Sequence, residues 1–462
     1  MTPSGPRVVH ADVGIVGAGP GGLAAANALA QAGLRVVVLD EGQRPGGQIH
    51  RQLPLGAAPP PAAAEPPSHA HGHSLLHTFA AQRIDLRAGA TVWDARPGRL
   101  WFEHDGASWL LLAERLLLAP GAYDRCVPFP GWTLPGVVTA GAVQVMVRGF
   151  AVAPGRRALV AGSGPLLLPT VTALTQAGVT VVAALEATSR WRTLRAAPAV
   201  LGNAARRREA LWYAKQLWRS GVRLRFGHTV FACEGDGRVQ RAVIGRVDAD
   251  GRPLRATART VEVDLVAAGF GLVPSVELAL RLGCATRFDP IRGGHCVVVD
   301  QRQQSSVPGV FAVGEICGIG GGEVAAVEGE LAAAAIVHAR GGPAPAAALQ
   351  RRARDERRSA DAMLRVFAPL PGLVELADAA TIVCRCEDVP LAAVRATAEL
   401  HGRSTRAVKL GCRAGMGPCQ GRICGPMMPA LVAGDGRLPA ELPVVQVPLK
   451  PVRTSTLVDA PQ

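Results

Sequence analysis

Four cysteines in the C-terminal part of the chain have the spacing of a metal centre. One residue separates Cys384 from Cys386, four residues separate Cys419 from Cys424, and 32 residues lie between the two pairs. Thiolates on two turns can bind a small iron–sulfur cluster or a tetrahedral zinc ion. We expect a helix over 391–401 to bridge the pairs, and we expect the cysteines to bind the cluster, with structural zinc as the alternative.

The residues around these cysteines favour a cluster. Four glycines between 415 and 425 allow backbone N–H groups to point at sulfur, which stabilises an anionic cluster. Cys412 is a spare cysteine in this segment, and we interpret it as a core residue. Three arginines add positive charge around the predicted site: Arg385, Arg413 and Arg422.

A glycine-rich turn near the N-terminus has the pattern of a dinucleotide site. An apolar strand ends at Gly17, and Gly19 and Gly22 then lead into a helix over 23–32. The first glycine permits the tight turn, the second lets a diphosphate approach the backbone, and the third lets the helix pack close to the strand. A second strand ends at Asp40, where a carboxylate can bond a ribose hydroxyl.

Two later segments are expected to complete this first site. The glycines of the loop 45–48 allow backbone to lie against a flat ring or a sugar. A strand ends at Gly314 and Glu315, and a helix over 323–339 follows, whose positive end suits the anionic edge of a reduced flavin. These segments predict an FAD site with the candidate residues Gly17, Gly19, Pro20, Gly22, Asp40, Glu41, Gly47, Gln48, Val92, Pro120, Gly121, Gly314 and Glu315.

A second strand–turn–helix unit begins at residue 157. It contains Gly162 and Gly164, and Glu186 follows at nearly the same spacing as Asp40 in the first unit. Leu167 occupies the third glycine position, and we expect it to hold the helix further from the strand. Gly162, Gly164 and Glu186 are therefore candidates for a second nucleotide site, and the sequence leaves open whether a nucleotide binds there.

Four histidines follow a proline- and alanine-rich stretch over 54–67, namely His69, His71, His73 and His77. No cysteine or acid is expected to accompany them at ligand spacing. We interpret the segment as an exposed loop leading into a helix, with a metal site as the less favoured alternative.

The composition indicates a globular chain of several domains. The 462 residues are 48% hydrophobic and 19% charged, with a formal net charge of +14. The arginine clusters at 206–208 and 351–358 lack interleaved aromatic residues, so we interpret them as solvated helix faces, with an acidic partner protein as the alternative and no nucleic acid expected.

The sequence also bears on the compartment. The glycines and polar residues within 13–32 argue against a transmembrane segment there, and we see no secretory signal. The clustering of cysteines near the C-terminus favours a reducing compartment over a disulfide framework. We expect a cytoplasmic protein, with peripheral association to the inner membrane through a complex as an option.

Residues 1 to about 340 resemble the flavoprotein disulfide-reductase superfamily, which has two dinucleotide-binding domains. That part of the chain has no closely spaced cysteine pair, so dithiol chemistry is not expected there. The segment from Cys384 to Cys424 is similar to the bacterioferritin-associated ferredoxin-like 2Fe-2S domain. Five cysteines are expected to be buried structural residues: Cys126, Cys233, Cys284, Cys296 and Cys317.

With the run of residues 121–137, the whole chain resembles the larger subunits of heteromeric opine oxidases, proline or hydroxyproline dehydrogenases and hydrogen cyanide synthase. The resemblance implies electron transfer between flavins through a 2Fe-2S cluster. It also implies a partner flavoprotein similar to D-amino acid oxidases, which oxidises the substrate, and a small ferredoxin-like subunit. We assign no catalytic residue in this chain.

The predicted fold is α/β, with two three-layer Rossmann-like dinucleotide-binding domains and a small helical C-terminal 2Fe-2S domain. The predicted boundaries are 1–150 and 265–340 for the FAD domain, 151–264 for the second nucleotide domain, 341–380 for a linker, 381–430 for the cluster domain and 431–462 for a tail.

The leading functional hypothesis is a redox subunit of an amino- or imino-acid dehydrogenase. The alternatives are a self-contained NAD(P)H-dependent reductase and a non-enzymatic assembly subunit with structural zinc. Opine, hydroxyproline, proline and glycine remain open as substrates.

Overall fold

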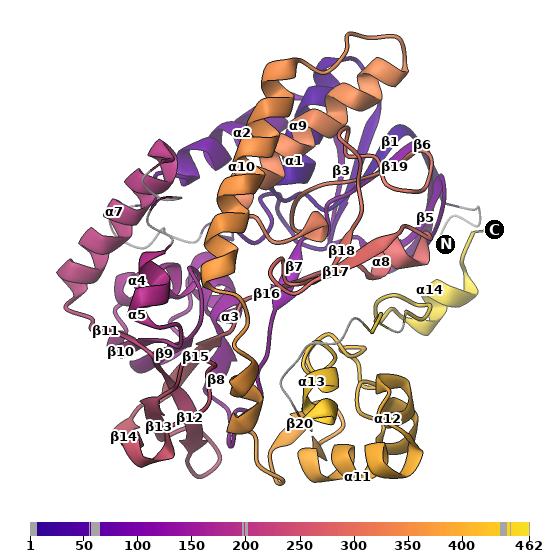
Figure 1. The fold of residues 1–462 in the computed structure, drawn as a ribbon. Coiled ribbons are helices and arrows are strands. Elements are labelled where there is room, and N and C mark those ends of the chain that lie inside the picture. The colour runs from indigo at the N-terminus through magenta and orange to yellow at the C-terminus, as the bar shows by residue number, and fades with distance from the viewer. Residues whose placement is uncertain are drawn as a thin grey trace.

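The first domain is built on a seven-stranded sheet in the computed structural model, which describes residues 7–54, 56, 65–195, 198, 202–434, 441–443 and 445–461 (Figure 1). Its strands are β1 (Val8–Val16), β2 (Val36–Asp40), β3 (Asp85–Ala88), β4 (Thr91–Arg96), β5 (Arg99–His104), β6 (Ala107–Leu118) and β19 (Val310–Ala312). Their order is β3-β2-β1-β6-β5-β4, with β19 beside β6. The pairs β3-β2, β2-β1, β1-β6 and β6-β19 are parallel, whereas β4 and β5 pair antiparallel.

Two helices of small residues pack tightly against each other in this domain, α1 (Pro20–Gln31) and α9 (Gly322–Ala339). A Cβ atom on Gly329 of α9 would lie 2.2 Å from the carbonyl oxygen of Gly21 on α1. Glycine and alanine are therefore needed where the helices meet, which explains the small residues of both sequences. The continuous apolar run of β2 is buried, as expected for an inner parallel strand.

The second domain has a five-stranded parallel sheet in the order β11-β10-β9-β15-β8. The strands are β8 (Val137–Thr139), β9 (Arg157–Gly162), β10 (Thr180–Glu186), β11 (Leu224–Phe226) and β15 (Leu265–Gly269). An antiparallel unit follows, with β12 (His228–Glu234), β13 (Arg241–Arg246) and β14 (Arg259–Glu262). The helical elements are α3 (Ala140–Gln144), η1 (Val145–Gly149), α4 (Leu167–Gln176), α5 (Arg190–Leu194), α7 (Ala204–Ser220) and η2 (Arg255–Thr257).

The predicted boundaries between these domains need correction. Strands β8 and β15 fall within 1–150 and 265–340, but both belong to the sheet of the second domain, where β15 pairs with β9 on one side and β8 on the other. Without them the buried strand β9 would have an unpaired edge, and each buried backbone polar group needs a partner. Because apolar strands of both sheets have similar patterns, the sequence could not assign these two strands to the correct sheet.

A short crossing connects the two domains. The ribbon of β7 (Ala122–Asp124) and β16 (Leu272–Pro274) lies between them, and α8 (Glu277–Arg281), β17 (Thr286–Asp289), β18 (Gly294–Val297) and η3 (Gly314–Cys317) return the chain to the first domain.

The predicted linker 341–380 contains regular structure instead. Helix α10 (Ala347–Val366) and the 3-10 turn η4 (Pro371–Leu376) lie in this interval. In Figure 1, α10 runs alongside α9 and continues down to the second domain, where Arg206 Nη1 lies 2.9 Å from Met363 Sδ. The helix therefore contacts both nucleotide-type domains.

The cluster domain contains β20 (Ile382–Cys384), β21 (Val389–Pro390), α11 (Leu391–His401), α12 (Thr405–Cys412) and α13 (Met428–Ala433), and α11 confirms the predicted helix. Its core is continuous with that of the second domain, and Trp132 Nε1 donates a 2.6 Å hydrogen bond to Ile382 O. This shared core fixes the cluster domain against the rest of the chain.

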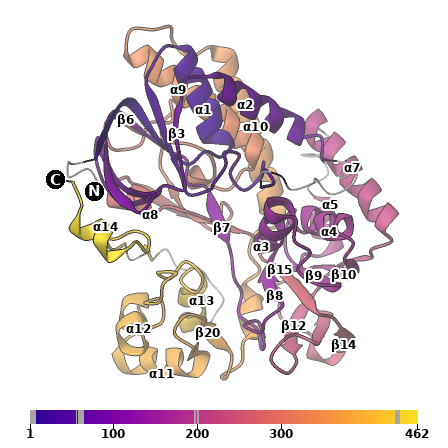
Figure 2. The ribbon, with the colours of Figure 1, turned by 180° about the vertical axis from the view of Figure 1, so that it is seen from behind.

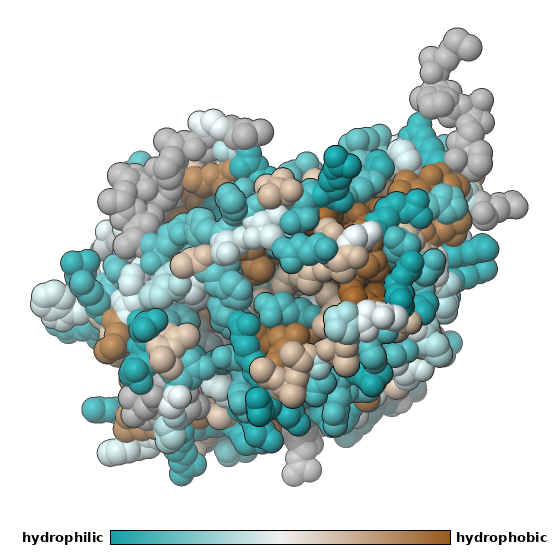
Figure 3. Space-filling view, turned by 90° about the horizontal axis from the view of Figure 1, so that it is seen from above, coloured by the Kyte–Doolittle hydropathy of each residue, from teal (hydrophilic) through white to brown (hydrophobic). Residues whose placement is uncertain are grey.

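The C-terminal segment, predicted as a tail, returns to the first domain (Figure 2). Helix α14 (Thr454–Val458) packs against β6, and Trp101 Nε1 donates a 2.8 Å hydrogen bond to Pro461 O. The predicted α/β fold class is confirmed. Seen from above, hydrophilic residues cover most of the face, with smaller hydrophobic areas between them (Figure 3), and none of the described helices is long and apolar enough to span a membrane.

Candidate functional site

Glycine is needed at the three positions of the first turn for different structural reasons. A Cβ on Gly17 would lie 2.2 Å from Ala119 O, and one on Gly22 would lie 1.9 Å from Gly17 O. A Cβ on Gly19 would meet only the Cα of Gly47, at 3.9 Å. The outer glycines thus pack against protein, whereas the middle one borders open space, as a diphosphate-binding turn requires.

Asp40 organises this turn from the end of β2. Its Oδ2 accepts a 2.5 Å hydrogen bond from Ala18 N, and its Oδ1 accepts a 2.7 Å bond from Gly42 N. Burial raises the pKa of the Asp40 carboxyl, while these two backbone donors act in the opposite direction. The loop containing Gly47 packs against the same turn, since a Cβ on Gly47 would lie 2.7 Å from the Cα of Gly19.

The remaining candidates of the first site divide into two groups. Pro120 and Gly121 follow Ala119 in the chain. Because the Ala119 carbonyl packs against Gly17, both residues lie at the turn. Gln48 Oε1 accepts a hydrogen bond from Arg51. Two candidates are engaged elsewhere: Glu41 lies 2.7 Å from Lys450 Nζ of the C-terminal segment, and Val92 is buried in the core behind the sheet.

Glu315 orders the loop that leads into α9. Its carboxylate accepts hydrogen bonds of 2.9 Å from Gly320 N and 2.8 Å from Gly321 N. Desolvation raises the pKa of Glu315, against the effect of these two bonds. Glu315 therefore positions the residues that precede the N-terminus of α9, whose positive end would suit the anionic edge of a bound flavin.

A buried ion pair, which the sequence did not reveal, supports this loop. Arg357 Nη2 on α10 lies 2.7 Å from Glu328 Oε1 on α9, and Arg357 Nη1 donates to Gly318 O at 2.5 Å. Glu328 Oε2 in turn accepts a 2.8 Å bond from Gly314 N. Interpreting all of 351–358 as solvated was wrong for Arg357, because one position of an otherwise charged helix faces α9. No local pattern distinguishes this arginine from its neighbours.

The acid of the second nucleotide-type turn is more deeply buried than Asp40 of the first turn. Glu186 is buried, and its carboxylate accepts bonds of 2.9 Å from Gly164 N and 2.8 Å from Thr188 N. Burial raises the pKa of Glu186. The nearest atom to a Cβ on Gly164 would be Phe367 Cβ at 4.0 Å, immediately after α10. This clearance is similar to that at Gly19, so the space beside the middle glycine does not distinguish the two turns.

The start of α4 also differs from that of α1. Helix α1 begins at Pro20, one residue after the second glycine, whereas α4 begins at Leu167, three residues after Gly164. Leu167 is buried, and a Cβ on Gly162 would lie 1.7 Å from Gly269 O. The backbone donors at the N-terminus of α4 therefore lie further along the chain from the turn than those of α1.

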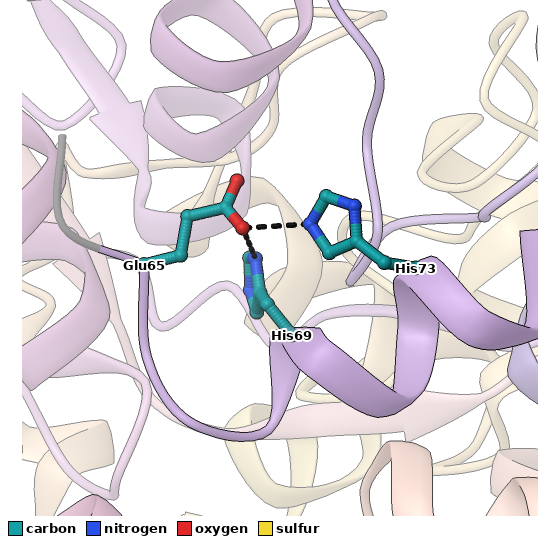
Figure 4. Close-up of side chains that lie close together, drawn as sticks. All are labelled: Glu65, His69 and His73. Carbon is teal, nitrogen blue, oxygen red and sulfur yellow. Dashed lines mark hydrogen bonds and ion pairs between the residues drawn. The ribbon is translucent and has the colours of Figure 1, made fainter. Parts of the chain in front are cut away.

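The histidine segment is helical from its first histidine, because α2 spans His69–Ala81. The expectation that no acid accompanies it was wrong. Glu65 Oε2 lies 2.7 Å from His73 Nε2 and 3.8 Å from His69 Nδ1, and His71 Nδ1 lies 2.9 Å from Glu323 Oε2 of α9 (Figure 4 shows the first group). Glu65 is one helical turn before His69, and Glu323 is distant in sequence.

The four predicted cluster ligands converge as two pairs. The thiols of Cys384 and Cys424 are within hydrogen-bonding reach, and so are those of Cys386 and Cys419. The hydrogen bond between the two thiols lowers the pKa of Cys384 to about 5 and raises the pKa of Cys424. A backbone donor also reaches the site, since Gly415 N lies 3.4 Å from Cys384 Sγ.

This arrangement fits a binuclear cluster better than zinc. Among the residues that the structure describes, the cysteine Sγ atoms form no group of three within 4.8 Å of one another. Tetrahedral zinc with Zn–S bonds of about 2.3 Å would bring all four sulfurs to about 3.8 Å from each other. Two pairs of thiols instead match two irons, each with two cysteine ligands. The Cys412 thiol donates a 3.2 Å hydrogen bond to Val408 O within its own helix, as expected for a cysteine that does not bind the cluster.

The two cofactor regions are connected by a short stretch of chain. Gly121 lies at the first glycine turn, and Cys126, five residues later, lines the same cavity as Arg385 and Ile423, which are next to the predicted ligands Cys384, Cys386 and Cys424. Five residues of extended chain span at most about 18 Å. A cavity of about 260 Å³ lies beside this segment, bounded by Cys126, Phe129, Phe270, Arg385 and Ile423 among others.

Known proteins share both parts of this architecture. Residues 11–339 match the pyridine nucleotide-disulphide oxidoreductase family, and residues 382–433 match the BFD-like 2Fe-2S binding domain. These matches indicate FAD in the first part and a 2Fe-2S cluster in the second. The chain is a flavin oxidoreductase of a multi-subunit type.

Individual relatives cover most of the chain. Hydrogen cyanide synthase subunit HcnB of Pseudomonas aeruginosa is 36% identical, over 89% of this chain and 90% of the relative. An opine oxidase subunit of Rhizobium meliloti is 31% identical, over 97% and 88% respectively. In fold, the chain is similar to L-proline dehydrogenase from P. horikoshii, with a TM-score of 0.71 and 20% identity, covering 98% of this chain and 80% of that one. Both relatives in sequence are named as subunits.

Proposed function

Because the chain belongs to the pyridine nucleotide-disulphide oxidoreductase family, we propose that it is the electron-transfer subunit of a heteromeric amino- or imino-acid dehydrogenase. Substrates of the opine, proline, hydroxyproline or glycine type would be oxidised at their C–N bond on a partner subunit. This chain would then pass the electrons between its FAD and its 2Fe-2S cluster.

The observation that carries this proposal is the short segment between the two cofactor regions. Its span of at most about 18 Å joins Gly121 at the first glycine turn to Cys126, which lines a cavity with Arg385 and Ile423 beside the predicted cluster ligands. The shared core of the second and cluster domains fixes the separation, because the cluster domain is not attached by a free linker. FAD exchanges one or two electrons and a 2Fe-2S cluster exchanges one, so neighbouring sites suit a relay.

The second nucleotide-type turn argues against a self-contained NAD(P)H reductase. The acid that would bond a ribose, Glu186, is buried, whereas Asp40 at the first turn is partly exposed. Helix α4 begins three residues after Gly164, so the backbone donors of its N-terminus lie further along the chain from the second glycine than those of α1. Electrons are therefore expected to enter from a partner rather than from a nicotinamide.

The names of the relatives support the existence of partners. The hydrogen cyanide synthase and opine oxidase relatives are each named as one subunit of a larger enzyme. We infer a flavoprotein similar to D-amino acid oxidases as the substrate-oxidising partner, with a small ferredoxin-like protein as a further subunit.

Co-purification from the native host tests the proposal. The complex is screened anaerobically for dye reduction with opines, proline, hydroxyproline and glycine. Reduction with one of these, but not with NADH or NADPH, is the expected result. Dye reduction by NADH alone, with none of the amino or imino acids active, would contradict it.

A pair of cysteine variants tests the role of the cluster. Cys384→Ser removes a proposed ligand, and Cys412→Ser is the matched control in the same domain. We expect the first variant to lose iron, acid-labile sulfide and substrate-dependent dye reduction while retaining FAD, and the second to retain all of them. Zinc without sulfide in the parent protein would end the electron-transfer proposal.

A further inference from the structure

We propose that Glu65, His69 and His73 form a binding site for a divalent transition-metal ion of the Zn²⁺ type. The site lies at the start of α2, apart from the predicted cluster ligands. Figure 4 shows both imidazole rings turned towards the same carboxylate oxygen, at 2.7 Å for His73 Nε2 and 3.8 Å for His69 Nδ1. The three ligand atoms all lie within 4.8 Å of one another.

Helix geometry explains why these residues converge. Residues four apart lie on the same face of an α-helix, so His69 and His73 present their rings side by side. Glu65 precedes His69 by the same interval, and its side chain closes the group from the segment before the helix. Two imidazole nitrogens and one carboxylate oxygen are ligands of the type that zinc takes in three-ligand sites.

The distances from the Glu65 carboxylate to the two imidazole nitrogens require only a small adjustment to accept a metal. Ligands at about 2.0–2.1 Å from a tetrahedral ion lie about 3.4 Å apart. The present separations of 2.7 and 3.8 Å fall on either side of that value. Replacing the shared hydrogen bond by metal coordination therefore needs the Glu65 carboxylate to move by less than about 1 Å from His73.

The surroundings fix one ligand and leave the others accessible. The side chain of His69 is 14% exposed, and its ring packs edge-on against His50 with 5.5 Å between centroids. The side chains of His73 and Glu65 are 65% and 49% exposed. An ion bound here would keep a coordination position open to solvent, which is typical of an exchangeable site.

Nearby charges of opposite sign partly cancel at this site, so the affinity for a metal is expected to depend mainly on the lone pairs of the imidazole and carboxylate ligands. Arg148 is close enough to His69 to act on it electrostatically and opposes a cation, while Glu65 favours one. Selectivity is therefore expected for metals that bind imidazole strongly, such as Zn²⁺ or Cu²⁺, over Mg²⁺ and Ca²⁺, which prefer oxygen ligands.

Calorimetric titration of the full-length protein, with its flavin and cluster loaded, tests the site with Zn²⁺ as the probe. The expected result is one high-affinity Zn²⁺ per chain in the parent, with iron content unchanged after titration. His69→Ala, His73→Ala and Glu65→Gln should each weaken binding by about tenfold or more, since even outer-shell changes cost about 10–100-fold. Circular dichroism shows that each variant is folded.

His77→Ala is the matched control, because His77 lies one turn further along the same helix. It should bind Zn²⁺ as the parent does. The proposal is wrong if the parent shows no such Zn²⁺ ion. It is also wrong if His77→Ala weakens binding as much as His69→Ala, because the metal would then sit on another histidine pair. Replacing Glu65 by Gln is informative even if His69→Ala unfolds, because the Glu65 side chain is half exposed.

Discussion

Removing the charge of Arg357 should destabilise the flavin domain more than removing any other charge of helix α10. Arg357→Met keeps an unbranched apolar stem but removes the guanidinium, its ion pair with Glu328 and its bonds to Gly318 O and Ile319 O. The side chains of Arg357 and Glu328 are 13% and 5% exposed, so Glu328 would be left as a buried charge. Breaking a buried pair in this way costs about 3–5 kcal/mol in unfolding free energy.

The consequence should reach the flavin, because the same residues support its predicted site. Glu328 accepts a hydrogen bond from Gly314 N, and Arg357 holds the loop that Glu315 orders from the other side. The assay is urea denaturation of the FAD-loaded protein, monitored by flavin fluorescence. We expect release of FAD from Arg357→Met at clearly lower urea than from the parent.

Arg358→Met is the matched control on the next residue. Its side chain is 79% exposed, and its ion pair with Asp355 spans 3.7 Å. Exposed pairs contribute about 0–1 kcal/mol, so this variant should release FAD close to the parent's midpoint. The double variant Glu328→Gln/Arg357→Met should recover part of the loss, because it no longer buries an unpaired charge. The reasoning is refuted if Arg357→Met and Arg358→Met have the same midpoint.

Two further outcomes follow from the glycine turn and from a buried thiol. Gly19→Ala should leave an intact fold with weakened FAD binding. Gly22→Ala should also lower thermal stability, because its Cβ would lie 1.9 Å from Gly17 O. Equal melting temperatures of the two apoproteins would contradict this expectation. Burial raises the pKa of Cys233 to about 12. At pH 8 the thiolate fraction of Cys233 should therefore be roughly 1,000-fold below that of an ordinary cysteine. Alkylation of Cys233 by iodoacetamide should be slowed in the same proportion, because the thiolate is the nucleophile. Peptide mass spectrometry measures the rate, which should rise with pH to beyond 10; rapid labelling at pH 8 would show that the thiol is accessible and ionised.

The parts of the site that could be predicted from the sequence are those encoded in short sequence patterns. The glycine turn, its acid at Asp40 and the helix between the cysteine pairs each depend on residues close together along the chain. Their chemistry could be inferred because Gly17 and Gly22 have a steric requirement, and because two pairs of thiols on turns fit a cluster.

The parts that the sequence missed depend on packing between distant elements. Arg357 has the same local context as its exposed neighbours, and only the position of α10 against α9 makes it a buried partner of Glu328. The position of Phe367 next to Gly164 likewise follows from the end of α10 meeting the second domain. Glu65 was missed for a different reason. It lies four residues before His69, where helix α2 begins, and the proline- and alanine-rich sequence there favours a loop.

Anaerobic stopped-flow reduction tests the central claim most directly. Mixing the purified complex with its amino- or imino-acid substrate should bleach the flavin and then produce the electron paramagnetic resonance signal of a reduced 2Fe-2S cluster. The isolated chain mixed with NADH or NADPH should keep its flavin oxidised over the same time. Rapid bleaching of the isolated chain by either nicotinamide would contradict the account, because it would show that the second nucleotide-type turn accepts a nucleotide despite the burial of Glu186 and the later start of α4.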